Sequence, residues 1–249
     1  MPERKAVATA LFEINAGLDR VELAERFAAE RRVQIRDVLT PETAVEVGKV
    51  LAGQTPWGVA WQAGLDGPHL VRREQLVGLP SIEQQAIGSK LTAAMKGGDY
   101  AFTYSSYPML DAYLGRWAPG SPHDLLLEYL NAPEFLDLVR EVTAMPELLK
   151  ADAQATLFKP GQFLAEHDDL GGTEGRQIAY VLNMTAGDWR PDWGGLLLFF
   201  DEDGDVVTGF RPRWNALNLF EVPQRHNVTY VPPFSPVGRF AITGWFRDR

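Results

Sequence analysis

The region from residue 151 to the C-terminus constrains the fold most, because it contains a run of short strand-like segments with no helical segment between them. Each segment is rich in β-branched and aromatic residues and is bounded by Gly, Pro or Asp. The segments are 154–158, 163–167, 178–183, 196–200, 205–208, 214–220, 226–231 and 239–246. Parallel strands need long crossover connections, usually helices. The order therefore predicts an α+β, mainly β fold: an antiparallel jelly roll, or double-stranded β-helix.

Helical periodicity dominates the first 150 residues. Apolar positions at helical spacing predict helices over 21–32, 41–52 and 81–95, and a fourth that is capped by Asn131 and ends before Pro146. The second begins at a capping hydroxyl, Thr40, followed by proline. We expect these helices to support one outer face of the jelly roll. No linker or internal repeat divides the chain, so we interpret 1–249 as a single domain, with helical support and edge strands in 1–150 and the jelly-roll core in 151–249.

Composition and charge exclude several classes of protein. The chain has 33 acidic and 24 basic residues, a net charge of −9 and no basic cluster, so we expect it to bind neither nucleic acid nor an anionic membrane surface. No apolar stretch approaches the ~20 residues of a membrane span, and the N-terminal apolar run is too short for a signal peptide. A cytoplasmic protein is expected. Cysteine is absent, which excludes disulfides, thiolate nucleophiles and iron–sulfur clusters.

A histidine–acid pair and a distant histidine form the main candidate site. His167, Asp168 and Asp169 follow one another at the end of the 163–167 segment. Alternate residues of a strand share a face, so His167 and Asp169 should point one way and Asp168 the other. With His226, they would form a two-histidine, one-carboxylate triad, which suits Fe(II) and oxygen chemistry. The alternative is a non-catalytic jelly-roll binding protein, with histidines that are structural or hold a non-redox metal.

The remaining histidines, His69 and His123, lie near proline and glycine and are interpreted as surface residues. The acidic segment 201–205 resembles a calcium loop, but its glycine comes too early and no closing acid follows. We interpret it as a hairpin turn.

The last segment, RFAITGWF, carries an arginine on one face. If Phe240, Ile242 and Phe246 face the core, the opposite face holds Arg239, Ala241, Thr243 and Trp245. A buried guanidinium needs an anion, and its planar shape matches a carboxylate through two hydrogen bonds. Arg239 is therefore a candidate carboxylate-binding residue; the alternative is a strand-end arginine that extends to solvent.

Five ordered pieces of sequence resemble the iron(II)- and 2-oxoglutarate-dependent dioxygenases, in particular the prolyl-4-hydroxylase-like group. They are LFKPGQF (157–163) before His167–Asp169, IAYVLN (178–183), GGL (194–196), His226, and RFAITGWF (239–246). The resemblance implies Fe(II) on His167, Asp169 and His226, with 2-oxoglutarate, O2 and optional ascorbate. It implies that the far carboxylate of 2-oxoglutarate binds Arg239.

Three further residues are cosubstrate-binding candidates through the same resemblance: Tyr180, Thr243 and Trp245. Tyr180 stands one position out of step with the usual tyrosine of that strand, where this chain has Val181. The interval between His226 and Arg239 is also longer than the family's and contains several prolines.

The implied activity is hydroxylation of a C–H bond, with a prolyl residue of a protein or peptide as the first candidate substrate. A free amino acid or another small molecule is the alternative. We expect the tyrosine-rich stretch 100–117 and the loop 171–175 to cover the substrate; alternatively, the tyrosines pack the helices onto the sheet.

Overall fold

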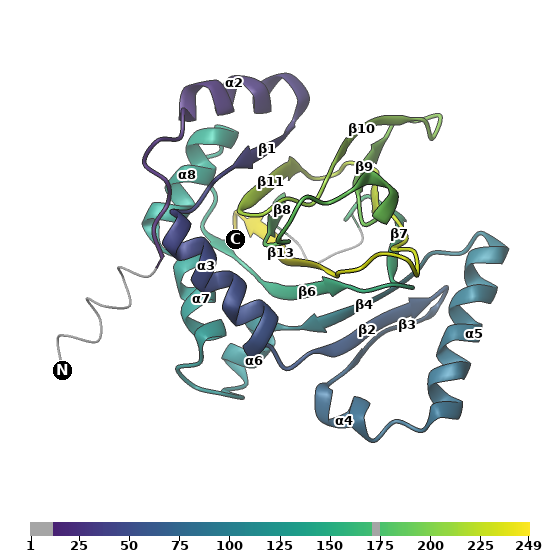
Figure 1. Ribbon diagram of the computed structural model, residues 1–249. Helices are drawn as coiled ribbons and strands as arrows, with labels where there is room; N and C mark the ends of the chain where they lie inside the picture. Colours follow the sequence, from purple (N-terminus) through teal and green to yellow (C-terminus); the bar gives the residue numbers. More distant parts are fainter. Residues whose placement is uncertain (1–11, 171–174) are drawn as a thin grey trace.

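The computed structural model describes residues 12–170 and 175–249, and antiparallel β-structure dominates it (Figure 1). In the N-terminal part the strands are β1 (Arg32–Arg36), β2 (Gly58–Ala63), β3 (Asp66–Val71), β4 (Ala101–Tyr107), β5 (Lys150–Ala151) and β6 (Gln154–Phe158). They continue with β7 (Phe163–His167), β8 (Arg176–Asn183), β9 (Leu197–Phe200), β10 (Val206–Phe210), β11 (Ala216–Glu221), β12 (His226–Val228) and β13 (Arg239–Arg247).

The helices lie almost entirely in the first 150 residues, as the periodicity predicts. They are α2 (Arg20–Glu30), α3 (Pro41–Lys49), α4 (Arg73–Val77), α5 (Ser81–Gly97), α6 (Met109–Leu114), α7 (Pro122–Leu130) and α8 (Pro133–Thr143). A π-helical segment, Val50–Gln54, continues α3, and a short 3-10 helix spans Pro191–Trp193. The Thr40 side chain caps α3 as expected, accepting from the backbone N–H of Thr43.

The sheet bends back on itself at β4, which is the reason for the barrel shape. Its strands follow the order β1-β11-β8-β13-β6-β4-β7-β12-β9-β10. One end of β4 pairs with β6 and the other with β7. The half containing β7, β12 and β9 therefore faces the half containing β11, β8 and β13, and the sheet encloses a nearly closed barrel (Figure 1). The predicted jelly-roll fold is confirmed.

The main hydrophobic core lies between the sheet and the N-terminal helices α2, α3, α6, α7 and α8 (Figure 1). Strand β8 shows the division of its two faces. Ile178, Tyr180 and Leu182 belong to this helix-side core. Ala179 and Val181 belong to a second cluster, with Leu197 and Phe199 from the opposite half of the barrel. The helices thus hold one wall of the barrel rigid while its interior stays available for a site.

The predicted helix bounds of the first half and most strand bounds of the second half agree with the structure, whereas the strands of the first half were not predicted. Strands β6 and β7 have the predicted bounds, and the acidic segment 201–205 forms the expected hairpin turn between β9 and β10. The stretch 100–117 is not a loop: it forms β4, within the sheet, followed by α6. Residues 171–174 of the other expected cover lie outside the described residues. None of the described helices combines the length and apolar character needed to cross a bilayer.

Candidate functional site

Strand pairing brings the two distant histidines together inside the barrel. Antiparallel pairing of β12 with β7 places His226 directly opposite His167. The two imidazole centroids are 4.1 Å apart, and the His226 ring also packs on Phe220. Only 5% of His226 is exposed.

The carboxylate of Asp169 completes the group, but through a turn and not through continued strand alternation. Strand β7 ends at His167, and Asp169 adopts a left-handed conformation with φ 67°, which aspartate tolerates better than most residues. Its Oδ1 lies 3.5 Å from His167 Nε2 and its Oδ2 lies 3.7 Å from His226 Nε2. The neighbouring Asp168 carboxylate instead accepts the backbone N–H of Leu170.

Both imidazoles are oriented by backbone carbonyls. His167 Nδ1 is 2.9 Å from the carbonyl of Ala165, and His226 Nδ1 is 2.7 Å from that of Gln224. A carbonyl only accepts, so each Nδ1 carries the proton and each Nε2 keeps its lone pair. The Nε2 atoms are the ones that face Asp169.

Electrostatics favour the metal-binding states of His226 and Asp169. Burial, together with the charge of His167, lowers the pKa of His226 to about 4. Burial alone would raise the pKa of Asp169, but hydrogen bonding to His167 and the charges of both histidines outweigh it, so the pKa is lowered. A neutral His226 and an ionised Asp169 are the protonation states that metal binding requires of these two residues.

The three side chains fit a metal ion. One donor atom from each of His167, Asp169 and His226 lies within 4.8 Å of the other two. Two imidazole nitrogens and one carboxylate oxygen on one side of an ion suit Fe(II) and leave coordination positions for other ligands.

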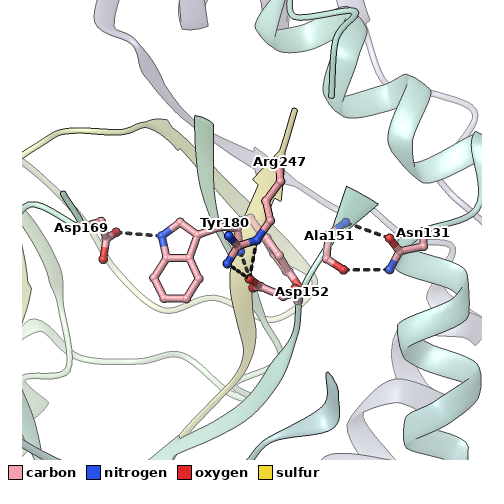
Figure 2. A network of polar contacts seen from close by, with 7 residues as sticks. Asn131, Ala151, Asp152, Asp169, Tyr180 and Arg247 are labelled. Carbon is pink, nitrogen blue, oxygen red and sulfur yellow. Dashed lines mark hydrogen bonds and ion pairs between the residues drawn. The ribbon is translucent and has the colours of Figure 1, made fainter. Parts of the chain in front are cut away.

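A tryptophan on β13 holds the carboxylate in place. The indole Nε1 of Trp245 donates to Asp169 Oδ2 over 3.1 Å, as the dashed contact to Asp169 in Figure 2 shows. The backbone N–H of Trp245 donates in turn to Asp152 Oδ1 over 2.9 Å, and Arg247 donates to Asp152 Oδ2 over 3.0 and 2.5 Å. The half-buried Asp152 therefore lies behind the site as a second anchor. No sequence pattern singles it out, because its position one residue before the alanine that leads into β6 gives no chemical signal.

Arg239 is buried in the same barrel, and no carboxylate of the described residues forms an ion pair with it. It is 2% exposed, and its Nε and Nη1 atoms are buried without hydrogen-bond partners. Burial lowers the pKa of its guanidinium to about 10. It lines a cavity of about 610 Å³ that also contains His167, Asp169 and His226. A dicarboxylate such as 2-oxoglutarate would bind the metal at one end and pair its other carboxylate with this buried guanidinium.

The other sequence candidates lie around this cavity with different orientations. Thr243 and Trp245 line it from β13. The Tyr180 hydroxyl donates to the carbonyl of Asp152 over 2.8 Å (Figure 2). Its ring packs on Phe246 on the helix side of the sheet. Its neighbour Val181 takes the interior position of β8.

Tyr104 of β4 and Tyr100, the residue that precedes this strand, form another wall of the cavity. Burial, opposed by a hydrogen bond with Gln154, raises the pKa of Tyr104 to about 12. The ring of Tyr100 lies 5.9 Å from that of His167. These tyrosines were expected in a cover over the site, and they lie instead in the barrel wall.

The surface interpretation of His123 is wrong. His69 is exposed and stacks on Trp61, but His123 is 4% exposed. Its Nε2 lies 2.9 Å from Thr55 Oγ1, and its ring contacts that of Tyr107. The preceding proline begins helix α7, so it marks a helix start and not a surface turn.

Comparison with known families agrees with this geometry. Residues 153–247, which contain β6 to β13 and all the cavity residues of those strands, match the family model of the 2OG-Fe(II) oxygenase superfamily. Curated proteins yield no match to the sequence.

Solved structures share the fold at low sequence identity. A prolyl-4-hydroxylase from Pseudomonas putida is 18% identical, with a TM-score of 0.54 over 95% of this chain and 98% of that one. A prolyl hydroxylase from Trichoplax adhaerens, in complex with a peptide fragment of the oxygen degradation domain of hypoxia-inducible factor, is 13% identical, with a TM-score of 0.58 over 100% and 94%. The non-heme alpha-ketoglutarate-dependent epimerase SnoN from nogalamycin biosynthesis is 14% identical, with a TM-score of 0.55 over 92% and 82%.

Proposed function

Because the chain belongs to the 2OG-Fe(II) oxygenase superfamily, whose cofactors are Fe(II), 2-oxoglutarate and O2, we propose that it hydroxylates a C–H bond of a prolyl residue in a protein or peptide. The observation that carries the proposal is the shared cavity: His167, Asp169 and His226 line it together with the partnerless Arg239. One group of side chains would hold Fe(II), and the other would bind the far carboxylate of 2-oxoglutarate.

Each residue has a definite task in this proposal. Fe(II) would supply the redox chemistry that activates O2. His167 and His226 present Nε2 to it because the carbonyls of Ala165 and Gln224 fix their tautomer. Asp169 contributes one negative charge, and the indole N–H of Trp245 fixes its rotation.

The barrel itself orients the cosubstrate and excludes water. Arg239 pairs with Phe158 in the β13–β6 ladder, and its guanidinium lies 5.4 Å from the Phe158 ring. An apolar wall beside the guanidinium removes competing solvent, so its attraction for a carboxylate is stronger than at the surface. A guanidinium in this place selects a cosubstrate that has a carboxylate remote from the metal.

A prolyl substrate is supported by two observations of different kind. The prolyl hydroxylases above share the fold, and one of them was solved with a bound peptide. In this chain, the cavity has aromatic walls from Tyr100, Phe102 and Tyr104, which suit an apolar ring. The fold alone does not fix the substrate, since the epimerase SnoN shares it.

The direct test is a peptide screen read by mass spectrometry. The Fe(II)- and 2-oxoglutarate-loaded protein is incubated in air with a library of proline-containing peptides and, in parallel, with free amino acids. We expect a gain of one oxygen atom on a prolyl residue, absent with His167→Ala. Oxygen incorporation confined to free amino acids would contradict the peptide substrate. If no condition consumes 2-oxoglutarate, the proposed oxygenase activity itself is contradicted.

A further inference from the structure

A second arginine reaches the cavity from β8, and no part of the proposed metal or cosubstrate site uses it. Arg176 is the first residue of β8 and lines the same cavity as His167, Asp169 and Arg239. Its guanidinium carbon lies 3.5 Å from the centroid of the Trp245 ring. It therefore stacks on the indole whose N–H holds Asp169. This contact holds the guanidinium beside the candidate metal ligands, in the wall of the cavity.

The guanidinium of Arg176 is attracted by the charges of Asp169 and Asp152, but it keeps an unsatisfied hydrogen-bond donor. Its Nε atom is buried and has no hydrogen-bond partner, and no carboxylate of the described residues forms an ion pair with the side chain. A buried N–H without an acceptor costs free energy. A ligand that accepts a hydrogen bond there would recover that loss.

The nearby carboxylates are already matched by other groups. Asp152 accepts from Arg247 and from the backbone of Trp245. Asp169 faces the two histidines and would be satisfied by the metal. Asp168, which also lines the cavity, accepts the backbone N–H of Leu170. Arg239 would be matched by the far carboxylate of 2-oxoglutarate, so none of these groups accepts a hydrogen bond from Arg176 Nε.

We propose that Arg176 binds a carboxylate of the substrate and so selects substrates with an acidic group close to the carbon that is oxidised. This inference rests on the proposed oxygenase function and narrows its substrate class. A planar guanidinium held on an indole face offers two parallel N–H groups, which match the two oxygens of a carboxylate. That carboxylate has two sources: the α-carboxylate of a free or C-terminal residue, or an acidic side chain next to the target residue in a peptide.

The experiment measures binding without turnover. The protein is loaded with Fe(II) and saturating 2-oxoglutarate without O2, and probes are titrated in by calorimetry. The first pair is N-acetyl-L-proline and its amide, which tests an α-carboxylate. The second pair is Ac-Ala-Pro-Glu-NH2 and the same peptide with Gln, which tests an acidic side chain. We expect the acid of at least one pair to bind at least tenfold more tightly than its amide.

Substitutions of Arg176 test whether this side chain causes the tighter binding of the acid. Arg176→Gln should abolish the acid preference, with no change in amide binding or in 2-oxoglutarate affinity. Arg176→Lys should recover part of it, because the charge returns without the planar fork. Arg26→Gln removes the same charge from the exposed face of α2 and should have no effect. Thermal unfolding of each variant checks that the fold is intact.

Each outcome decides the matter. Equal binding of acid and amide in both pairs, or an acid preference that survives Arg176→Gln, would overturn the inference while leaving the oxygenase in place. Failure of Fe(II) and 2-oxoglutarate to load in the first step would overturn the proposed function, and the inference with it. If Arg176→Gln does not fold, Arg176→Lys serves as the deciding variant: undiminished acid preference there would overturn the carboxylate fork.

Discussion

The indole N–H of Trp245 donates a hydrogen bond to the carboxylate of Asp169 over 3.1 Å. This bond joins the last strand of the chain, β13, to the turn that follows β7, so a side chain from one half of the barrel orients the candidate metal ligand of the other. Behind it, Asp152 holds the backbone of the same tryptophan (Figure 2). The candidate site therefore depends on Trp245 and Asp152, neither of which is one of the three candidate metal ligands.

Removing that hydrogen bond should weaken metal binding. Trp245→Phe keeps an aromatic ring but loses the indole N–H, so Asp169 is free to rotate. Loss of such an outer contact to a metal ligand typically costs 10–100-fold in affinity, and we expect a loss of about that size for Fe(II) measured by anaerobic titration. Trp193→Phe, in the short 3-10 helix, is the matched control and should bind Fe(II) as the wild type does. Unchanged affinity in Trp245→Phe would show that the bond does not position Asp169.

The Asp152 carboxylate should matter for stability as well. Asp152→Asn removes a charged acceptor shared by Arg247 and the Trp245 backbone, in a pair whose side chains are 13% and 15% exposed. Hydrogen bonds to charged groups contribute about 1.5–3 kcal/mol, and denaturant unfolding should show a loss of that order. Asp188→Asn is the control, because that carboxylate is 92% exposed in its contact with Arg211, and exposed ion pairs contribute about 0–1 kcal/mol. Equal effects of the two changes would contradict the anchoring role.

Arg239 should control the affinity for 2-oxoglutarate. Arg239→Ala removes the charged partner from a desolvated carboxylate, a change that costs about 2–5 kcal/mol, so the KM for 2-oxoglutarate should rise more than tenfold. Arg239→Lys should recover part of the loss because the charge remains and the fork geometry does not. Steady-state turnover at varied 2-oxoglutarate concentration makes the comparison. A KM unchanged in Arg239→Ala would place the cosubstrate elsewhere.

The buried His123 should make the fold sensitive to acid. Burial, opposed by the charge of Asp124, lowers its pKa to about 4 in the folded chain, against about 6.5 in an unfolded chain. The unfolded state therefore takes up the proton first as the pH falls. The stability that this residue contributes is complete above pH 6.5 and is lost between pH 6.5 and about 4, with a slope of at most about 1.4 kcal/mol per pH unit.

Unfolding free energies measured from pH 7 to pH 4 test this point. In His123→Gln the slope between pH 6.5 and 4 should be shallower than in the wild type. His69→Gln is the control, because His69 is exposed, and it should retain the wild-type slope. Parallel curves for the wild type and His123→Gln would contradict the assignment.

The sequence predicted the parts of the site that depend on local periodicity and on residue type. The bounds of β6 and β7, the cluster of His167, Asp169 and His226, and the interior position of Arg239 all follow from strand alternation and from the scarcity of histidine. The choice of Asp169 over Asp168 was also correct for the geometry. Its reason was incomplete, because a left-handed turn and not a continued strand directs the carboxylate.

The features that we did not predict from the sequence depend on pairing between distant segments. Asp152 acquires its role only because β13 lies beside β6, which brings Trp245 and Arg247 to it. Arg176 reaches Trp245 through the pairing of β8 with β13. Strands β2 and β3 were not predicted because glycine, proline and histidine interrupt the alternation of apolar and polar residues. Local sequence does not encode these neighbours.

The most direct test of the central claim is Fe(II)-dependent formation of succinate from 2-oxoglutarate in air, without added substrate, by the wild type and two aspartate variants. We predict that wild type and Asp168→Ala form succinate, since the Asp168 carboxylate accepts the backbone N–H of Leu170 and is not in the candidate metal-ligand group. Asp169→Ala should form none above the level without Fe(II), because its carboxylate is the one that faces both histidines. Succinate formation that survives in Asp169→Ala, or that needs no Fe(II) in the wild type, would contradict the account.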